Sequence, residues 1–176
     1  MHLIILTLIL FFIATNIITE FVNRKTLSPL TNPMSSYLAG VPLAWLQDLG
    51  FGALAVVLLI LPLIFPFSML EIATFYLSAV AIAGVVGTKW VIQESGNLAE
   101  RALMERIHVI CAGIAFAGTT LGLLLYTWPH DGLAFGAGVG AVISAALFAR
   151  FAPKQTALEE KSYTALLMIS LLALVR

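Results

Sequence analysis

Residues 107–128 read IHVICAGIAFAGTTLGLLLYTW, an apolar run without Asp, Glu, Lys or Arg that ends in Tyr126 and Trp128. A helix of this length is about 33 Å long at 1.5 Å per residue, and the hydrocarbon core of a bilayer is about 30 Å thick. Tyrosine and tryptophan are enriched where a membrane-spanning helix meets the water interface. The stretch therefore predicts a transmembrane helix that ends at a membrane surface.

Five other apolar runs repeat this pattern. Together, the predicted spans cover residues 2–19, 49–67, 72–88, 107–128, 132–149 and 162–175. The last run would reach only about 21 Å as a helix. It therefore either extends backward past Lys161, with Glu159 and Glu160 near the surface, or forms a surface helix beside five spans. The predicted fold class is all-α: a polytopic integral membrane bundle of about six transmembrane helices, in one domain over residues 1–176.

The composition excludes several classes of protein. Hydrophobic residues make up 61% of the chain and charged residues 10%, whereas a soluble domain has about 25% charged residues. The formal net charge is zero, and no basic patch predicts nucleic-acid binding. Cys111 is the single cysteine, which excludes an intrachain disulfide framework. Only Met1 and His2 precede the first apolar run, so we expect an uncleaved helix rather than a signal peptide.

The basic residues predict an orientation. Eight of them fall in the predicted first, third and fifth loops: Arg24, Lys25, Lys89, Arg101, Arg106, Arg150, Lys154 and Lys161. Only Arg176 falls on the other side. Because Lys and Arg are concentrated in cytoplasmic loops, loops one, three and five are predicted to be cytoplasmic and both termini to lie outside.

A stripe of small residues predicts close helix packing. Gly132, Gly136 and Gly140 recur every four residues on the fifth span, and such a stripe lets a neighbouring backbone approach. Gly118 and Gly122 offer a similar surface on the fourth span. We expect packing within the bundle, and a homodimer seam is the alternative.

A polar group of residues predicts a ligand pocket at the face formed by loops one and three. Its members are Ser35, Ser36, Tyr37, Gln47, Asp48, Glu105 and His108. Since both loops lie on one side, these side chains could form a pocket of the size of a lipid headgroup. Two simpler interpretations stay open. Asp48 could interact only with the start of the second span, and His108 could be a neutral histidine hydrogen-bonded to loop one, for instance to Tyr37 or to a backbone carbonyl there.

The spacing Glu105-x-x-His108 also occurs in metal-binding helices, where it comes in pairs. Here there is one copy, so Asp48, Glu105 and His108 are only weak candidates for metal ligands. Bis-histidine haem ligation would need a second histidine at the depth of His108, and the sequence offers none. We therefore predict neither a metal nor a cofactor.

The same residues resemble a bacterial multi-pass membrane family catalogued as domain of unknown function number 998. The loop and the entry into the second span are similar to that family at Ser28, Pro29, Leu30, Pro33, Ser35, Gly40, Trp45, Leu46 and Phe51. The start of the fourth span is similar at His108, Ala112 and Phe116. The family commonly has Asp before that histidine, where this chain has only Glu. The resemblance implies a six-helix protein of the bacterial inner (plasma) membrane and no established activity.

Three functions follow as hypotheses. The leading one is a non-enzymatic membrane protein that binds lipid or a membrane partner as an accessory or scaffold subunit, because the loops are short and the contacts must lie in the bilayer. The alternative is a membrane-embedded, metal-dependent hydrolase acting on lipid through Asp48, Glu105 and His108. A small transporter is third, because the span interiors contain few ionisable residues.

Overall fold

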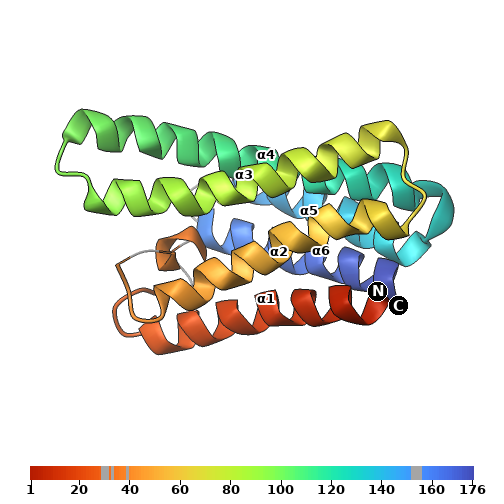
Figure 1. The fold of residues 1–176 in the computed structure, drawn as a ribbon, viewed down its shortest axis with the longest axis horizontal. Helices are drawn as coiled ribbons and strands as arrows, with labels where there is room; N and C mark the ends of the chain where they lie inside the picture. The colour runs from red at the N-terminus through yellow and green to blue at the C-terminus, as the bar shows by residue number, and fades with distance from the viewer. Residues whose placement is uncertain (29–31, 33, 39, 152–155) are drawn as a thin grey trace.

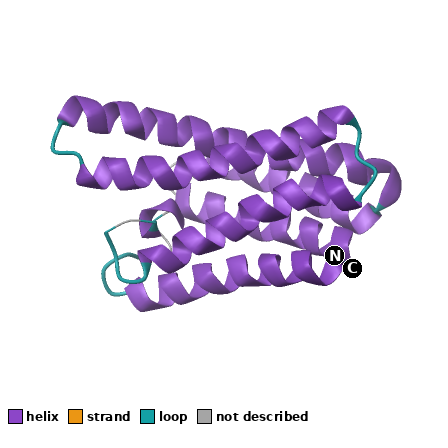
Figure 2. Ribbon diagram, viewed as in Figure 1, coloured by secondary structure: helices purple, strands orange, loops and turns teal. Residues whose placement is uncertain are grey.

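The chain folds into a bundle of six α-helices. The computed structural model describes residues 1–28, 32, 34–38, 40–151 and 156–176. Within them the helices are α1 (His2–Asn23), α2 (Ala44–Ile64), α3 (Met69–Glu94), α4 (Leu98–His130), α5 (Gly132–Phe151) and α6 (Thr156–Val175), with a short 3₁₀ helix η1 (Met34–Tyr37) before α2. No strand occurs among the described residues (Figure 2). The predicted all-α bundle of about six helices is confirmed.

The helices alternate in direction along the bundle (Figure 1). Both termini lie at one end, which we call the terminal end, and His2 Nδ1 is 3.3 Å from the Val175 carbonyl there. The opposite end, where α1, α3 and α5 finish and α2, α4 and α6 begin, is the loop end. A chain that crosses a membrane six times needs helices that alternate in direction in this way. Which side of the membrane the loop end faces stays a prediction.

Four helices, α1 to α4, are long and apolar enough to cross a membrane. Among the described residues, α5 contributes a shorter apolar stretch, Gly132–Leu147. Helix α6 packs against α5, α1 and α4, and begins six residues before the predicted span 162–175. It therefore extends backward past Lys161, one of the two possibilities that the sequence left open.

Several boundaries differ from those predicted, for local reasons. Helix α2 begins at Ala44 and ends at Ile64, two residues before Pro66. Helix α3 begins at Met69 because Ser68 and Glu71 form a capping box. Helix α4 begins at Leu98, after the Asn97 side chain caps it, and its 33 residues measure about 50 Å. The α3–α4 hairpin therefore projects beyond the rest of the bundle at the loop end (Figure 1).

The distribution of side chains is that of a membrane protein. Large apolar residues on the outside are widely exposed, as at Leu63, Val80 and Val109, while polar Gln47 and Ser78 are fully buried. A surface of this kind is stable against lipid and unstable against water. The chain is an integral membrane protein built as a helical bundle.

Close glycine packing occurs between α3 and α4. A Cβ added at Gly122 would lie 2.6 Å from Thr74 Oγ1 and 3.0 Å from the Phe75 ring, so the two helices touch through this glycine. At Gly132 and Gly136, by contrast, an added Cβ would meet no described atom within 4 Å. We expected these two glycines to pack against a neighbouring helix of the bundle, and the structure does not show that contact.

The reason is the rotation of α5 about its axis. This helix turns Gly138 toward α4, where an added Cβ would lie 2.9 Å from Leu124 Cδ2. At Gly140 the added Cβ would make only ordinary contact, at 3.7 Å from Leu166. The spacing of the glycines was visible in the sequence, but the direction in which the stripe faces was not.

Candidate functional site

The residues predicted for a polar pocket lie in separate contacts. The fully buried Gln47 donates a hydrogen bond from Nε2 to Asn16 Oδ1 on α1. Asp48 accepts a hydrogen bond of 2.9 Å from Trp90 Nε1 on α3. Each of these two side chains of α2 is thus bound to a different neighbouring helix.

Tyr37 is fully buried, and its hydroxyl lies 3.5 Å from the Leu27 carbonyl. Burial, and secondarily the Glu20 carboxylate, raise the pKa of Tyr37 above its ordinary value. Ser36 is half-buried in η1, and the side chain of Ser35 lies outside the described part of the structure. Of the predicted loop-one residues whose side chains the structure describes, Tyr37 is thus packed into the core and Ser36 is half-buried.

The predicted residues on α4 are bound to α3. His108 Nδ1 lies 3.1 Å from the Val85 carbonyl and 3.0 Å from Thr88 Oγ1, whereas Glu105 is exposed. The simpler interpretation expected His108 to bond to loop one, whereas its contacts are with α3. Among the described residues, no three His, Cys, Asp or Glu side chains are placed to hold one metal ion. The structure does not bring Asp48, Glu105 and His108 together.

A different place combines an open groove with polar side chains. We call it the α4–α5–α6 groove; it has a volume of about 530 Å³ and opens on the outside of the bundle. Its walls are Gly113, Phe116, Ala117, Thr120, Leu121 and Leu124 of α4, Val142 and Ala145 of α5, and Glu159, Glu160 and Tyr163 of α6. The apolar wall runs along α4 toward the terminal end, and the two carboxylates lie near the beginning of α6.

Hydrogen bonds hold the polar end of the groove in place. Tyr163 donates a hydrogen bond of 2.9 Å to the Phe116 carbonyl and also contacts Thr120 Oγ1. Its ring meets the Phe116 ring edge to face, with centroids 5.2 Å apart. Glu160 Oε2 accepts a hydrogen bond of 2.9 Å from the Met34 amide in η1. The polar end is therefore a built surface, since α4, α6 and η1 all contribute to it.

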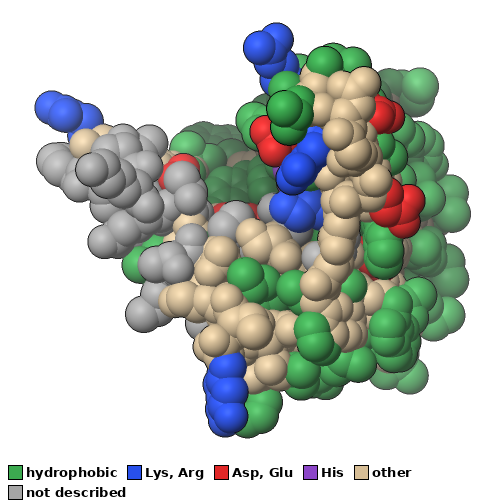
Figure 3. Space-filling model, turned by 90° about the vertical axis from the view of Figure 1, so that its left-hand side faces the viewer, with side chains coloured by type: hydrophobic (Ala, Val, Ile, Leu, Met, Phe, Trp, Pro, Cys, Tyr) green, Lys and Arg blue, Asp and Glu red, His purple; other side chains and the backbone are tan. Residues whose placement is uncertain are grey.

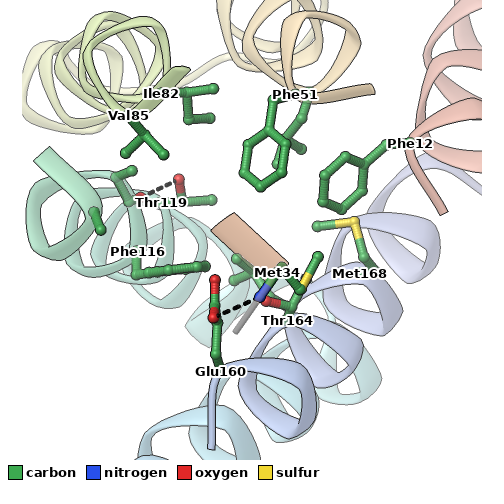
Figure 4. Close-up of a pocket in the computed structure, with 14 residues that line it drawn as sticks. Phe12, Met34, Phe51, Ile82, Val85, Phe116, Thr119, Glu160, Thr164 and Met168 are labelled. Atoms are coloured by element: carbon green, nitrogen blue, oxygen red, sulfur yellow. Dashed lines mark hydrogen bonds between the residues drawn. The ribbon is translucent and has the colours of Figure 1, made fainter. Parts of the chain in front are cut away.

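Behind the groove lies a small cavity at the centre of the bundle (Figure 4). It has a volume of about 40 Å³ and is almost entirely apolar, with Phe12, Phe51 and Met168 in its walls (Figure 4). Phe116 and Glu160 line both this cavity and the groove, so they separate the two.

Thr164 also lines the central cavity, one helical turn after Glu160. The side chain is 6% exposed, and its Oγ1 is buried without a hydrogen-bond partner among the described residues. A buried polar atom of this kind costs free energy unless something binds it. Within the part of the chain that the structure describes, the Thr164 hydroxyl is thus a buried polar group that faces the central cavity.

A second groove lies on the other side of α6, between α6 and α1. It has a volume of about 350 Å³ and shares Met34, Thr164 and Met168 with the central cavity. A salt bridge of 2.8 Å between Lys161 Nζ and Glu20 Oε1 lies at its loop end. The first half of α6 is thus flanked by hollows on both sides.

The loop end carries charges of both signs around an apolar hollow (Figure 3). Lys89 of α3 is half-buried there, and the carboxylates of Glu105 and Glu160 act on it electrostatically. The structure gives Lys89 no hydrogen bond or salt bridge to a described residue.

The sequence analysis did not single out Glu159, Glu160, Tyr163 and Thr164, because with the sixth span predicted to begin at Ser162 the two acids shared no helical face with Tyr163 and Thr164. That boundary leaves both acids in a loop. A signal was present, however, because Glu159 and Tyr163, and likewise Glu160 and Thr164, are four residues apart and would share a face if the helix began earlier.

Comparison with known proteins returned no match: no family model, curated protein or solved structure is significantly similar to this chain. The resemblance to domain of unknown function number 998 stays a prediction. The functional argument therefore depends on the site itself.

Proposed function

We propose that this integral membrane protein binds a membrane lipid in the α4–α5–α6 groove and acts by holding it, not by catalysis. The observation that carries the proposal is the groove: a hollow of about 530 Å³ on the outside of the bundle, apolar along most of its length and polar at one end. A lipid has the same division between its acyl chain and its headgroup.

The groove matches an acyl chain in position and length. It opens beside Leu121 and Val142, which are exposed on the outside of the bundle where acyl chains surround the protein. From Gly113 to Leu124 it extends about 16 Å along α4 at 1.5 Å per residue. An empty groove would forfeit dispersion contacts along its whole wall, so a chain lying in it stabilises the protein.

The other hypotheses have less support from the geometry. A metal-dependent hydrolase would need Asp48, Glu105 and His108 at one point. Instead, Asp48 bonds to Trp90, His108 contacts the Val85 carbonyl, and Glu105 is exposed. A role as an accessory subunit beside other membrane proteins is compatible with lipid binding. The accessory role, however, is supported only by the short loops.

Two matched glycine variants test the proposal. Gly113 and Gly52 are both exposed helical positions where an added Cβ meets nothing within 4 Å, but only Gly113 lines the groove. We expect Gly113→Trp to fill the groove and lose co-purified lipid, and Gly52→Trp to retain it, as measured by native mass spectrometry after gentle extraction. Equal lipid retention in the two folded variants would rule out this groove as the binding site.

A further inference from the structure

We infer that the hollow between α1 and α6 binds a second lipid, an acyl-ester glycerolipid, and that the Thr164 hydroxyl donates a hydrogen bond to one of its ester carbonyls. We call this hollow, of about 350 Å³, the α1–α6 groove. The inference goes beyond the proposed function, because it concerns a separate site on the other side of α6. It also names the chemical group by which that site recognises its ligand.

The α1–α6 groove opens on the outside of the bundle. Ile17 on one wall and Ile169 on the other are both exposed, so the rim of the groove faces the acyl chains of the bilayer. From Lys161 to Leu172 the α6 wall is about 17 Å long at 1.5 Å per residue. The walls consist of Phe12, Ile13, Asn16, Ile17 and Glu20 of α1, Met34 of η1, and Lys161, Thr164, Ala165, Met168, Ile169 and Leu172 of α6. Most of this surface is apolar and suits an acyl chain.

An ion pair marks the loop end of the groove. Lys161 Nζ lies 2.8 Å from Glu20 Oε1, and both side chains line the groove. Charged groups are costly in hydrocarbon, and those near helix ends extend to the interface, so this pair lies at the level of lipid headgroups. Because the two charges cancel, the pair does not select a headgroup by its charge. The group that recognises the lipid lies deeper.

Thr164 is that group. It follows Lys161 by three residues on α6, about 4.5 Å further along the helix axis, at the level where ester carbonyls join the headgroup region to the acyl chains. Thr164 lines the groove and is 6% exposed, and its Oγ1 has no hydrogen-bond partner among the described residues. By contrast, the hydroxyls of Thr119, Thr120 and Thr127 each donate to the backbone carbonyl four residues earlier. The Thr164 hydroxyl is a buried donor that its own helix does not satisfy.

An ester carbonyl supplies the missing acceptor. A buried hydroxyl without a partner costs free energy that an acceptor on a ligand would offset. Asn16, the other uncharged polar side chain with a hydrogen-bonding side group in these walls, is already bonded to the Phe12 carbonyl and to Gln47. Thr164 lies beside Met34, where the groove adjoins the central cavity (Figure 4). In this apolar setting the fitting acceptor is one attached directly to an acyl chain.

The experiment compares diester and diether phosphatidylcholines of the same chain length, which differ only in the two carbonyl oxygens. The full chain carrying Gly113→Trp, which fills the α4–α5–α6 groove, is incubated in detergent with an equimolar mixture, and native mass spectrometry distinguishes the bound lipids by mass. We expect the diester to bind about threefold to tenfold tighter, the value of one hydrogen bond. Thr164→Val should abolish this preference, and Thr164→Ser, which keeps the hydroxyl, should retain it.

A pair of matched variants tests the groove itself. Ala165 and Ala83 are both exposed helical alanines, but only Ala165 lines the α1–α6 groove. We expect Ala165→Trp to retain less lipid than the parent chain and Ala83→Trp to retain as much. Thr164→Val should unfold at the same denaturant concentration as the parent in lipid-free detergent, because it removes a hydroxyl that has no partner in the described structure. A lower midpoint would show that the hydroxyl is bonded within the protein and would overturn the inference.

The remaining outcomes are equally decisive. Equal binding of the diester and the diether, or a preference for the diester that survives Thr164→Val, overturns the ester contact. Equal lipid retention by Ala165→Trp and Ala83→Trp overturns the α1–α6 groove as a binding site. Both results leave the proposed function standing, since that function is tested by Gly113→Trp against Gly52→Trp.

Discussion

The contact of α3 with α4 through Gly122 gives the sharpest stability prediction. In Gly122→Ala the added Cβ would lie 2.6 Å from Thr74 Oγ1 and 3.0 Å from Phe75 Cζ, whereas ordinary van der Waals contact begins at 3.4 Å. Phe75 is fully buried and packs against Phe67, with ring centroids 4.9 Å apart. The ring therefore cannot retreat without displacing the core.

Relief through Thr74 is also costly. Its Oγ1 donates a hydrogen bond of 2.7 Å to the Glu71 carbonyl, and rotation of the side chain breaks that bond. Overpacking a core costs about 1–3 kcal/mol, and a lost hydrogen bond adds about 1 kcal/mol. The gain in helix propensity of up to about 1 kcal/mol offsets part of this cost, so we expect Gly122→Ala to lower the free energy of unfolding by about 1–3 kcal/mol.

The control lies on the same helix. Gly113→Ala places its Cβ in open space and gains up to about 1 kcal/mol from higher helix propensity. Equilibrium unfolding in mixed micelles of dodecyl maltoside and sodium dodecyl sulfate measures both variants. Adding Thr74→Ala to Gly122→Ala should recover part of the loss. If Gly122→Ala unfolds at the same denaturant concentration as Gly113→Ala, α3 and α4 do not approach as closely as the structure shows.

Three other predictions concern polar contacts. Asn16→Ala and Gln47→Ala in a double-mutant cycle should give a coupling energy of about 0.6–1.7 kcal/mol, because the two side chains share a buried hydrogen bond; a coupling near zero in the same unfolding assay would contradict that bond. Exchanging the charges, Glu20→Lys with Lys161→Glu, should restore the stability that either single change removes, since their salt bridge joins α1 to α6; a double variant no better than the singles would argue against the pair. The pKa of Asp131 is lowered, first by a hydrogen bond from the Ala134 amide and further by Arg176 and the Leu133 amide. The ionised Asp131 carboxylate therefore stabilises the folded protein fully above the ordinary pKa near 4, and this stabilisation is lost as the pH falls through the lowered pKa. Titration of unfolding between about pH 6 and 3 should therefore show a steeper loss in the parent chain than in Asp131→Ala.

Hydropathy predicted the number and order of the helices but not where each one ends. The apolar runs mark the parts of helices that lie in the hydrocarbon core, and a helix can continue into water beyond it. Helix α3 continues to Glu94 and α4 begins at Leu98, so charged residues that predicted a loop belong to a projecting hairpin. Capping by Ser68 and Asn97 set starts that hydropathy does not register.

The predicted pocket required more than topology could supply. Topology placed Asp48 and His108 at the same end of the bundle, and the structure agrees with that placement. Topology does not specify the rotation of a helix about its own axis. Asp48 faces Trp90 and His108 faces Thr88, so each binds to α3 and neither faces the other.

The charges of α6 connect the fold to the proposed site. Glu159, Glu160 and Lys161 distinguish this helix from the four that qualify as spans by their composition. Lys161 has its counter-charge on α1, and the first half of α6 is flanked by grooves and by the central cavity. Hollows beside a helix leave apolar side chains without packing contacts, which a bound ligand can supply. Added phospholipid should therefore raise the unfolding midpoint of the parent chain and raise it less in Gly113→Trp, whose side chain fills the groove, because the stabilisation grows with affinity at a fixed lipid concentration.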